Sequence, residues 1–153
     1  MSESARIAEE IRLAFEGEAW HGPALLEVLS GVDARTAAAR PVGSAHSIWE
    51  LAMHVATWEG AMLRRIDGAA WEPSDAENFP AAGDAGEAAW KKAVAQITGV
   101  NQRLVKAVAA MPDSRLAQQV PGKNYDFYFM LHGAAQHAAY HGGQIALLKR
   151  AQE

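Results

Sequence analysis

The chain has 153 residues, of which 50% are hydrophobic and 21% charged, so it has the size and composition of one folded domain over residues 1–153 and not of a disordered chain. Its net charge of −4, with Lys and Arg scattered along the chain, argues against a nucleic-acid partner. The absence of cysteine excludes disulfides, a thiol nucleophile and thiolate metal ligands.

The first ten residues, MSESARIAEE, carry acidic side chains where a signal peptide has a basic region and then an apolar run. No apolar stretch approaches the roughly 20 residues that cross a bilayer. We therefore expect a cytoplasmic protein without a membrane partner.

Helical periodicity predicts four long helices, and no segment shows the clear alternation of a strand. The first helix is expected over residues 4–15, where Ile7, Ile11 and Phe15 recur at a spacing of four on one face.

A short helix and a second long helix follow. Pro23 suits the first turn of a short helix over 24–29, which Gly31 can close. The second long helix is expected over 44–66, where residues three and four apart form one apolar stripe: Ile48, Leu51, Val55, Trp58 and Met62.

The next segment, GAAWEPSDAENFPAAGD (68–84), is rich in Pro, Gly, Asp and Asn and predicts a loop of unusual length for a compact domain. Two interpretations stay open. The loop is either a crossover connection between helices or a segment that lines or covers a functional site.

The third long helix is expected to open with Asp84 and Glu87, which are three residues apart and suit a helix N-terminus. Pro112 ends it. Its buried face is predicted to consist of Trp90, Val94, Ile97, Leu104, Val108 and Met111.

A turn-rich link over 121–126 leads into the fourth long helix, expected over 127–150. Helices alone at this chain length predict an all-α fold of the four-helix-bundle type. The links at 32–44 and 68–83 are long enough for crossover connections.

The fourth helix carries His137 and His141, one turn apart on one face. Ala134, Ile145 and Leu148 continue that face, so we expect both imidazoles to point into the bundle. An unpartnered buried polar group costs roughly 1–3 kcal/mol, so two adjacent ones call for a shared partner. A divalent metal ion is one such partner, because neutral imidazole nitrogens bind it.

His54, in the second long helix, is the best candidate for a third ligand, because facing helices of a bundle commonly build metal sites. Three histidines with an open position form a catalytic type of metal site. The alternative is that all three are core histidines that hydrogen-bond to carbonyl groups. The motif also lacks the glutamate of the HExxH zinc proteases.

Three further residues are placed to support such a site. Gln144 and Tyr140 lie near His141 in the sequence, and Glu50 lies four residues before His54. A ligand imidazole usually donates its other N–H to such a group. The adjacent pair Gly142–Gly143 is costly inside a helix, and a close approach by another backbone or a ligand would explain it.

The remaining histidines lack a partner at helical spacing and are expected to be structural or on the surface. His21 has no assigned contact, His46 could cap the second long helix, and His132 is expected to be a satisfied core histidine.

Three segments resemble the DinB-like superfamily of DinB/YfiT-type metal-dependent bundle proteins. HSIWELAMHVATWEGAMLRRIDG (46–68) is similar to the second helix of that family, and HGAAQHAAYHGGQIALLKR (132–150) to its last helix. ENFP (77–80) resembles part of its long loop. The family's ligand positions fall on the three histidines proposed above.

The resemblance implies a four-helix bundle with a crossover topology, a three-histidine site that usually holds nickel or zinc, and a homodimer. Characterised relatives include transferases that use low-molecular-weight thiols such as bacillithiol, and a mycothiol-dependent maleylpyruvate isomerase. The chain shows no obvious basic cluster near the triad for the carboxylates of such a thiol, although Arg64, Arg65 and Lys123 could serve.

The leading hypothesis is therefore a metal-dependent thiol S-transferase that acts on a small electrophile under the long loop. Gln144, Tyr140 and Glu50 would orient the ligands or the thiol. One alternative is a metal-dependent hydrolase that uses a metal-bound hydroxide with Glu50 as base. The other is a non-catalytic metal-binding stress-response protein.

Overall fold

A computed structural model describes all residues, 1–153, and every regular element in it is a helix. The predicted all-α class is confirmed. The seven α-helices are α1 (Glu3–Glu16), α2 (Leu25–Leu29), α3 (Ala34–Ala38), α4 (Ile48–Ile66), α5 (Asp75–Asn78), α6 (Glu87–Ala109) and α7 (Phe127–Arg150), and a 3-10 turn, η1, covers Asp113–Arg115.

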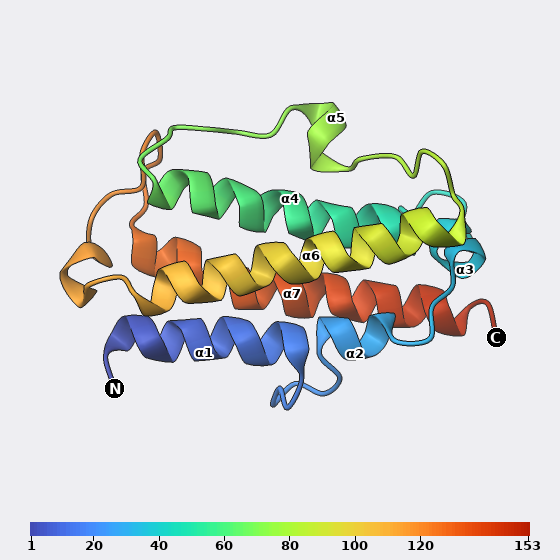
Figure 1. Cartoon of the computed structure of the whole chain (residues 1–153), viewed down its shortest axis with the longest axis horizontal. Helices are drawn as coiled ribbons and strands as arrows, with labels where there is room; N and C mark the ends of the chain where they lie inside the picture. Colours follow the sequence, from blue (N-terminus) through green and yellow to red (C-terminus); the bar gives the residue numbers. More distant parts are fainter.

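The four long helices α1, α4, α6 and α7 lie side by side (Figure 1). Among these four helices, α4 contacts α6, α6 contacts α1, α1 contacts α7, and α7 contacts α4. α1 and α7 run in one direction, and α4 and α6 run in the other (Figure 1). The connection from α4 to α6 follows the length of these two helices and carries α5. No helix has both the length and the apolar character needed to cross a bilayer.

α4 begins at Ile48, where the apolar stripe begins, and not at the predicted residue 44. Its start is set by a capping box. The Ser47 hydroxyl accepts a hydrogen bond from the Glu50 amide at 3.2 Å, and the Glu50 carboxylate accepts one from the Ser47 amide at 2.7 Å. The expectation that His46 caps this helix is wrong, because Ser47 occupies the cap.

α6 begins at Glu87, so the predicted start at Asp84 is also wrong. The Asp84 carboxylate accepts a hydrogen bond from the Gly86 amide and holds the turn that precedes the helix. α3 was not predicted and lies inside the expected 32–44 link, where the Asp33 side chain caps the Thr36 amide at 2.8 Å. α7 has the predicted bounds.

Two large apolar clusters fill most of the interior, a small third cluster of alanines joins α1 to α7, and the polar site lies between the two large clusters. On α4, one cluster reaches Ala56 and the other starts at Met62. On α7, the cluster that contains Met62 ends at Ala134, and the cluster that contains Ala56 includes Ile145 and Leu148. The segment of α7 between Ala134 and Ile145 carries the predicted metal ligands, so the packing leaves room there for polar side chains.

Candidate metal centre

The structure brings His54 on α4 together with His137 and His141 on α7. One ring nitrogen from each residue lies within 4.8 Å of the corresponding nitrogens of the other two. Nε2 of His54 lies 3.0 Å from Nε2 of His137. The centroids of the His137 and His141 rings are 4.4 Å apart, as expected for side chains one helical turn apart.

Two of the three imidazoles have a partner for the nitrogen that faces away from the cluster. Nδ1 of His54 lies 2.7 Å from the carbonyl oxygen of Asn78, and Nδ1 of His141 lies 2.6 Å from Oε1 of Gln144. Because these oxygens only accept hydrogen bonds, both Nδ1 atoms carry the proton. The Nε2 atoms are then left with a lone pair that is free to bind a metal ion.

Burial favours the neutral form of all three imidazoles, which is the form that binds a metal ion. Burial away from water lowers the pKa of His137 to about 3, and electrostatic repulsion from His141 and His54 lowers it in the same direction. Burial also lowers the pKa of His54, against the opposing effect of the Asn78 carbonyl. It lowers the pKa of His141, against the opposing effect of the Gln144 side chain.

This donor set fits a divalent cation. Two nitrogen ligands on a tetrahedral ion at about 2 Å are about 3.3 Å apart; the His54–His137 pair lies close to that spacing at 3.0 Å, and all three nitrogens lie within 4.8 Å of one another. Lone pairs brought this close repel one another unless a proton or a cation lies between them. The three histidines could therefore hold one metal ion, with room for a further ligand.

The long connection between α4 and α6 covers the cluster, which favours the second of the two interpretations left open for it. The Phe79 ring stacks between the rings of His54 and His46, with centroid distances of 4.0 Å and 3.8 Å. The Asn78 side-chain oxygen accepts a hydrogen bond from the Trp58 indole at 2.8 Å. This segment therefore both connects α4 to α6 along their length (Figure 1) and holds His54 in place.

A cavity of about 420 Å³ opens beside the cluster and runs along the groove between α4 and α7. Its walls are mainly apolar and aromatic, with few polar groups. The lining residues are His54, Trp58, Met62, Arg65, Asn78, Tyr125, Phe129, Met130, Gly133 and His137. A pocket of this size and character suits a small organic molecule.

A sequence model of the DinB superfamily matches residues 19–145, which include all three histidines. The chain belongs to the DinB superfamily. Searches of curated proteins and of solved structures gave no match. Membership in this superfamily confirms the resemblance seen in the sequence, and together with the three-histidine cluster it indicates a metal-binding protein.

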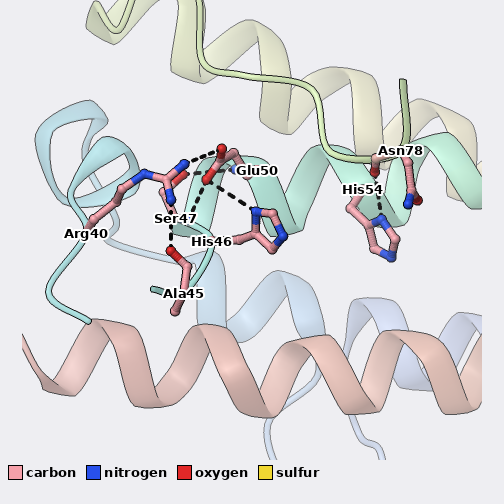
Figure 2. Close-up of polar contacts among 7 residues, drawn as sticks. All are labelled: Arg40, Ala45, His46, Ser47, Glu50, His54 and Asn78. Carbon is pink, nitrogen blue, oxygen red and sulfur yellow. Dashed lines mark hydrogen bonds and ion pairs between the residues drawn. The ribbon is translucent and has the colours of Figure 1, made fainter. Parts of the chain in front are cut away.

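Glu50 does not reach the cluster in this DinB superfamily member. Figure 2 shows its carboxylate turned toward the start of α4, away from His54. It accepts hydrogen bonds from the Ser47 amide and from Arg40, the latter at 2.5 Å, and lies 3.7 Å from Nδ1 of His46. The predicted role of Glu50 at the metal or substrate has no support in this geometry.

The other two predicted supporting residues differ in their placement. Gln144 holds His141 through the hydrogen bond described above. Tyr140 packs edge-on to the His141 ring at 5.0 Å, but its side chain is 66% exposed and does not line the cavity. Its catalytic role stays a prediction.

Gly142 lies against α2, where an added Cβ would sit 3.9 Å from the Leu25 backbone, whereas nothing lies close to Gly143.

The remaining histidines are outside the cluster. His132 is only half-buried and pairs with Glu10 of α1 at 2.8 Å, so the expectation of a core histidine is wrong. His21 is exposed. The sequence reasoning missed the contacts of Asn78 and Phe79 with His54. Only the similarity of ENFP to the family's loop drew attention to that segment.

Proposed function

We propose that this protein is a metal-dependent thiol S-transferase, built on a four-helix bundle with one long crossover connection. The observation that carries the proposal is the three-histidine cluster, two of whose members, His54 and His137, line a largely apolar cavity. His54, His137 and His141 would hold the ion, with nickel or zinc as the expected metals. When bound, the ion would lower the pKa of a thiol at its open position and so supply the reactive thiolate near neutral pH.

The chain's own residues prepare this site in two ways. The Asn78 carbonyl and the Gln144 side chain fix the orientation of two ligand imidazoles, so the donor nitrogens need little reorganisation. The aromatic side chains of the cavity wall, Trp58 and Phe129, give an apolar electrophile a surface to pack against.

The proposed reaction is a substitution at carbon. A sulfur–carbon bond forms, and the bond from that carbon to its leaving group breaks. The leaving group departs with the bonding electron pair, and the thiol proton passes to solvent. The cavity beside the histidines would hold the electrophile within reach of the sulfur.

The lining of the cavity favours thiol transfer over hydrolysis. Metal-dependent hydrolysis commonly uses a carboxylate as general base, and no Asp or Glu lines this cavity. The candidate base, Glu50, is held by Ser47 and Arg40 instead. A thiol needs no such base once its pKa is lowered.

The test is thiol consumption by protein loaded with zinc, nickel or manganese. Monochlorobimane serves as the electrophile, with glutathione, cysteine and bacillithiol as thiols. We expect metal-dependent conjugation with at least one thiol and its loss in His137→Ala. His132→Ala, which changes a histidine on the same helix outside the cluster, should retain the activity. No conjugation with any thiol and metal would refute the proposal.

A further inference from the structure

Arg65 ends the cavity on the side away from the histidines. It lies on the same face of α4 as His54, Trp58 and Met62, and it lines the same cavity. Its side chain is almost fully buried, which is rare for an arginine unless its charge is compensated. The guanidinium carbon sits 5.5 Å from the centroid of the Trp58 ring.

Most of the hydrogen-bonding capacity of this buried guanidinium is unused. Its Nε donates to the Trp71 carbonyl at 3.2 Å, and its terminal nitrogens make no hydrogen bond. Nη2 lies 3.0 Å from a carboxylate oxygen of Glu72, but without the alignment of a hydrogen bond. A planar guanidinium offers five N–H donors in a fork that matches a carboxylate, and the two on the buried Nη2 are left without an aligned acceptor.

The charges at this end of the cavity do not cancel. Glu72 is the common ion-pair partner of both Arg65 and Lys123. One carboxylate therefore faces two cations, and the group carries a net charge of +1. The Glu72 side chain is 48% exposed, so it can leave the guanidinium at little cost, whereas the buried Arg65 cannot move out.

The span of the cavity limits what can bridge its two ends. The Trp58 ring centroid is 6.3 Å from that of His54, and together with the Trp58–Arg65 distance this places the guanidinium within about 12 Å of the His54 ring. The walls between them are apolar, formed by Met62, Met130 and Trp58.

We propose that Arg65 binds a carboxylate of the substrate, which replaces Glu72 on the guanidinium. The ligand class is a small, singly charged carboxylic acid with an apolar middle and its reactive group at the histidines. The placement of the reactive group at the histidines rests on the proposed function. The carboxylate itself belongs to either the thiol or the electrophile of that reaction. A net charge of +1 matches one carboxylate.

The test measures the binding of two unreactive ligands to the metal-free protein. Hexanoate and hexanamide have the same chain and differ only in charge. Their binding is followed by NMR through the Arg65 Nε–H and Trp58 indole N–H signals. We expect hexanoate to bind about tenfold more tightly than hexanamide, because it adds charge-assisted hydrogen bonds. Equal affinities would overturn the proposal.

Three variants test the residues. Arg65→Met should reduce the preference for hexanoate to about twofold or less. Glu72→Gln, at a half-exposed position that should tolerate it, should strengthen hexanoate binding because it removes the competing carboxylate. Arg64→Met is the matched control, since Arg64 stacks on Trp71 and does not line the cavity. Unchanged hexanoate affinity in Glu72→Gln would overturn the proposal even if Arg65→Met failed to fold.

The two proposals can fail separately. A carboxylate preference that depends on Arg65, in a protein that transfers no thiol, would refute the transferase and leave the carboxylate site standing. Thiol transfer with no carboxylate preference would refute the carboxylate site alone. If thiol transfer is confirmed, kinetics of the metal-loaded enzyme show whether the thiol or the electrophile carries the carboxylate. Arg65→Met should raise the KM for whichever carboxylate-bearing substrate, thiol or electrophile, occupies this end.

Discussion

Replacing Glu59 by glutamine should remove a large pH dependence of the protein's stability. Glu59 lies on α4 in the interface with α6, and its side chain is fully buried. Its Oε1 accepts one hydrogen bond, from Nδ2 of Asn101 at 3.0 Å. Its Oε2 and the Asn101 Oδ1 atom are both buried without a partner. Burial raises the pKa of Glu59 from 4.5 to about 8, against the opposing effect of Asn101.

The sign and size of the effect follow from the two pKa values. Below pH 4.5 the carboxyl is protonated in both states and burial costs no ionisation energy. Between pH 4.5 and about 8 the unfolded chain loses the proton and the folded protein keeps it, so stability falls as pH rises. The slope is about 1.4 kcal/mol per pH unit, which amounts to a loss of about 5 kcal/mol across the window.

Glutamine has the shape of the protonated acid and supplies a donor where the acid carries its proton. Glu59→Gln should therefore keep the Asn101 contact and lose the pH dependence. In urea unfolding with a chelator present, the stability of wild type relative to Glu59→Gln should fall by about 3 kcal/mol between about pH 5.5 and about pH 7.5. The titration of the histidines cancels in this difference.

Glu18→Gln is the control, because it removes the same charge from an exposed position. Its pH dependence should run parallel to that of wild type. Parallel curves for wild type and Glu59→Gln would refute the reasoning, since they would mean that water or a rearranged partner reaches the Glu59 carboxyl in the folded protein.

Three further substitutions test the surroundings of the candidate metal centre. Gln144→Ala removes the hydrogen bond that orients His141 and should lower zinc affinity by about 10- to 100-fold in a competition titration; unchanged affinity would contradict a positioning role. Phe79→Ala removes the ring stacked on His54 and should increase amide hydrogen exchange over residues 74–82, whereas unchanged exchange would show that the stack does not hold the loop. Glu50→Gln should lower the free energy of unfolding by about 1–2 kcal/mol through the weakened α4 cap and Arg40 pair, with thiol transfer retained; loss of transfer at full metal loading would instead place Glu50 in the chemistry.

The histidine cluster could be predicted from the sequence because most of the information was local. His137 and His141 share one face of a single helix, and the apolar residues around them show that this face is buried. The third ligand required a choice between helices. His54 was the best candidate because it lies in the middle of the second predicted long helix, at the edge of its apolar stripe, and the structure bears out that choice.

The contacts of the loop were out of reach of the sequence because they depend on tertiary packing. The hydrogen bond from His54 to the Asn78 carbonyl joins residues 24 positions apart. Its acceptor is a backbone carbonyl, which every residue has, so the residue type does not identify it. The stacking of Phe79 on His54 likewise depends on where the loop crosses α4. Spacing along one helix says nothing about either contact.

Glu50 shows how a local interaction overrides a predicted long-range one. Its position four residues before His54 suggested a supporting role at the metal, but Ser47 is only three residues away and offers its amide at the start of the helix. The S-x-x-E pattern of a capping box was present in the sequence and would have assigned both the start of α4 and the partner of Glu50.

Metal content is the measurement that tests the central claim most directly. Protein purified without a histidine tag, as wild type, His54→Ala and His132→Ala, is analysed by mass spectrometry after reconstitution with zinc or nickel. We predict close to one ion per chain in wild type and in His132→Ala, and a sharp loss in His54→Ala, because α4 and α7 share the ion. No metal in wild type, or full occupancy in His54→Ala, would contradict the assignment of His54, His137 and His141 as one metal centre.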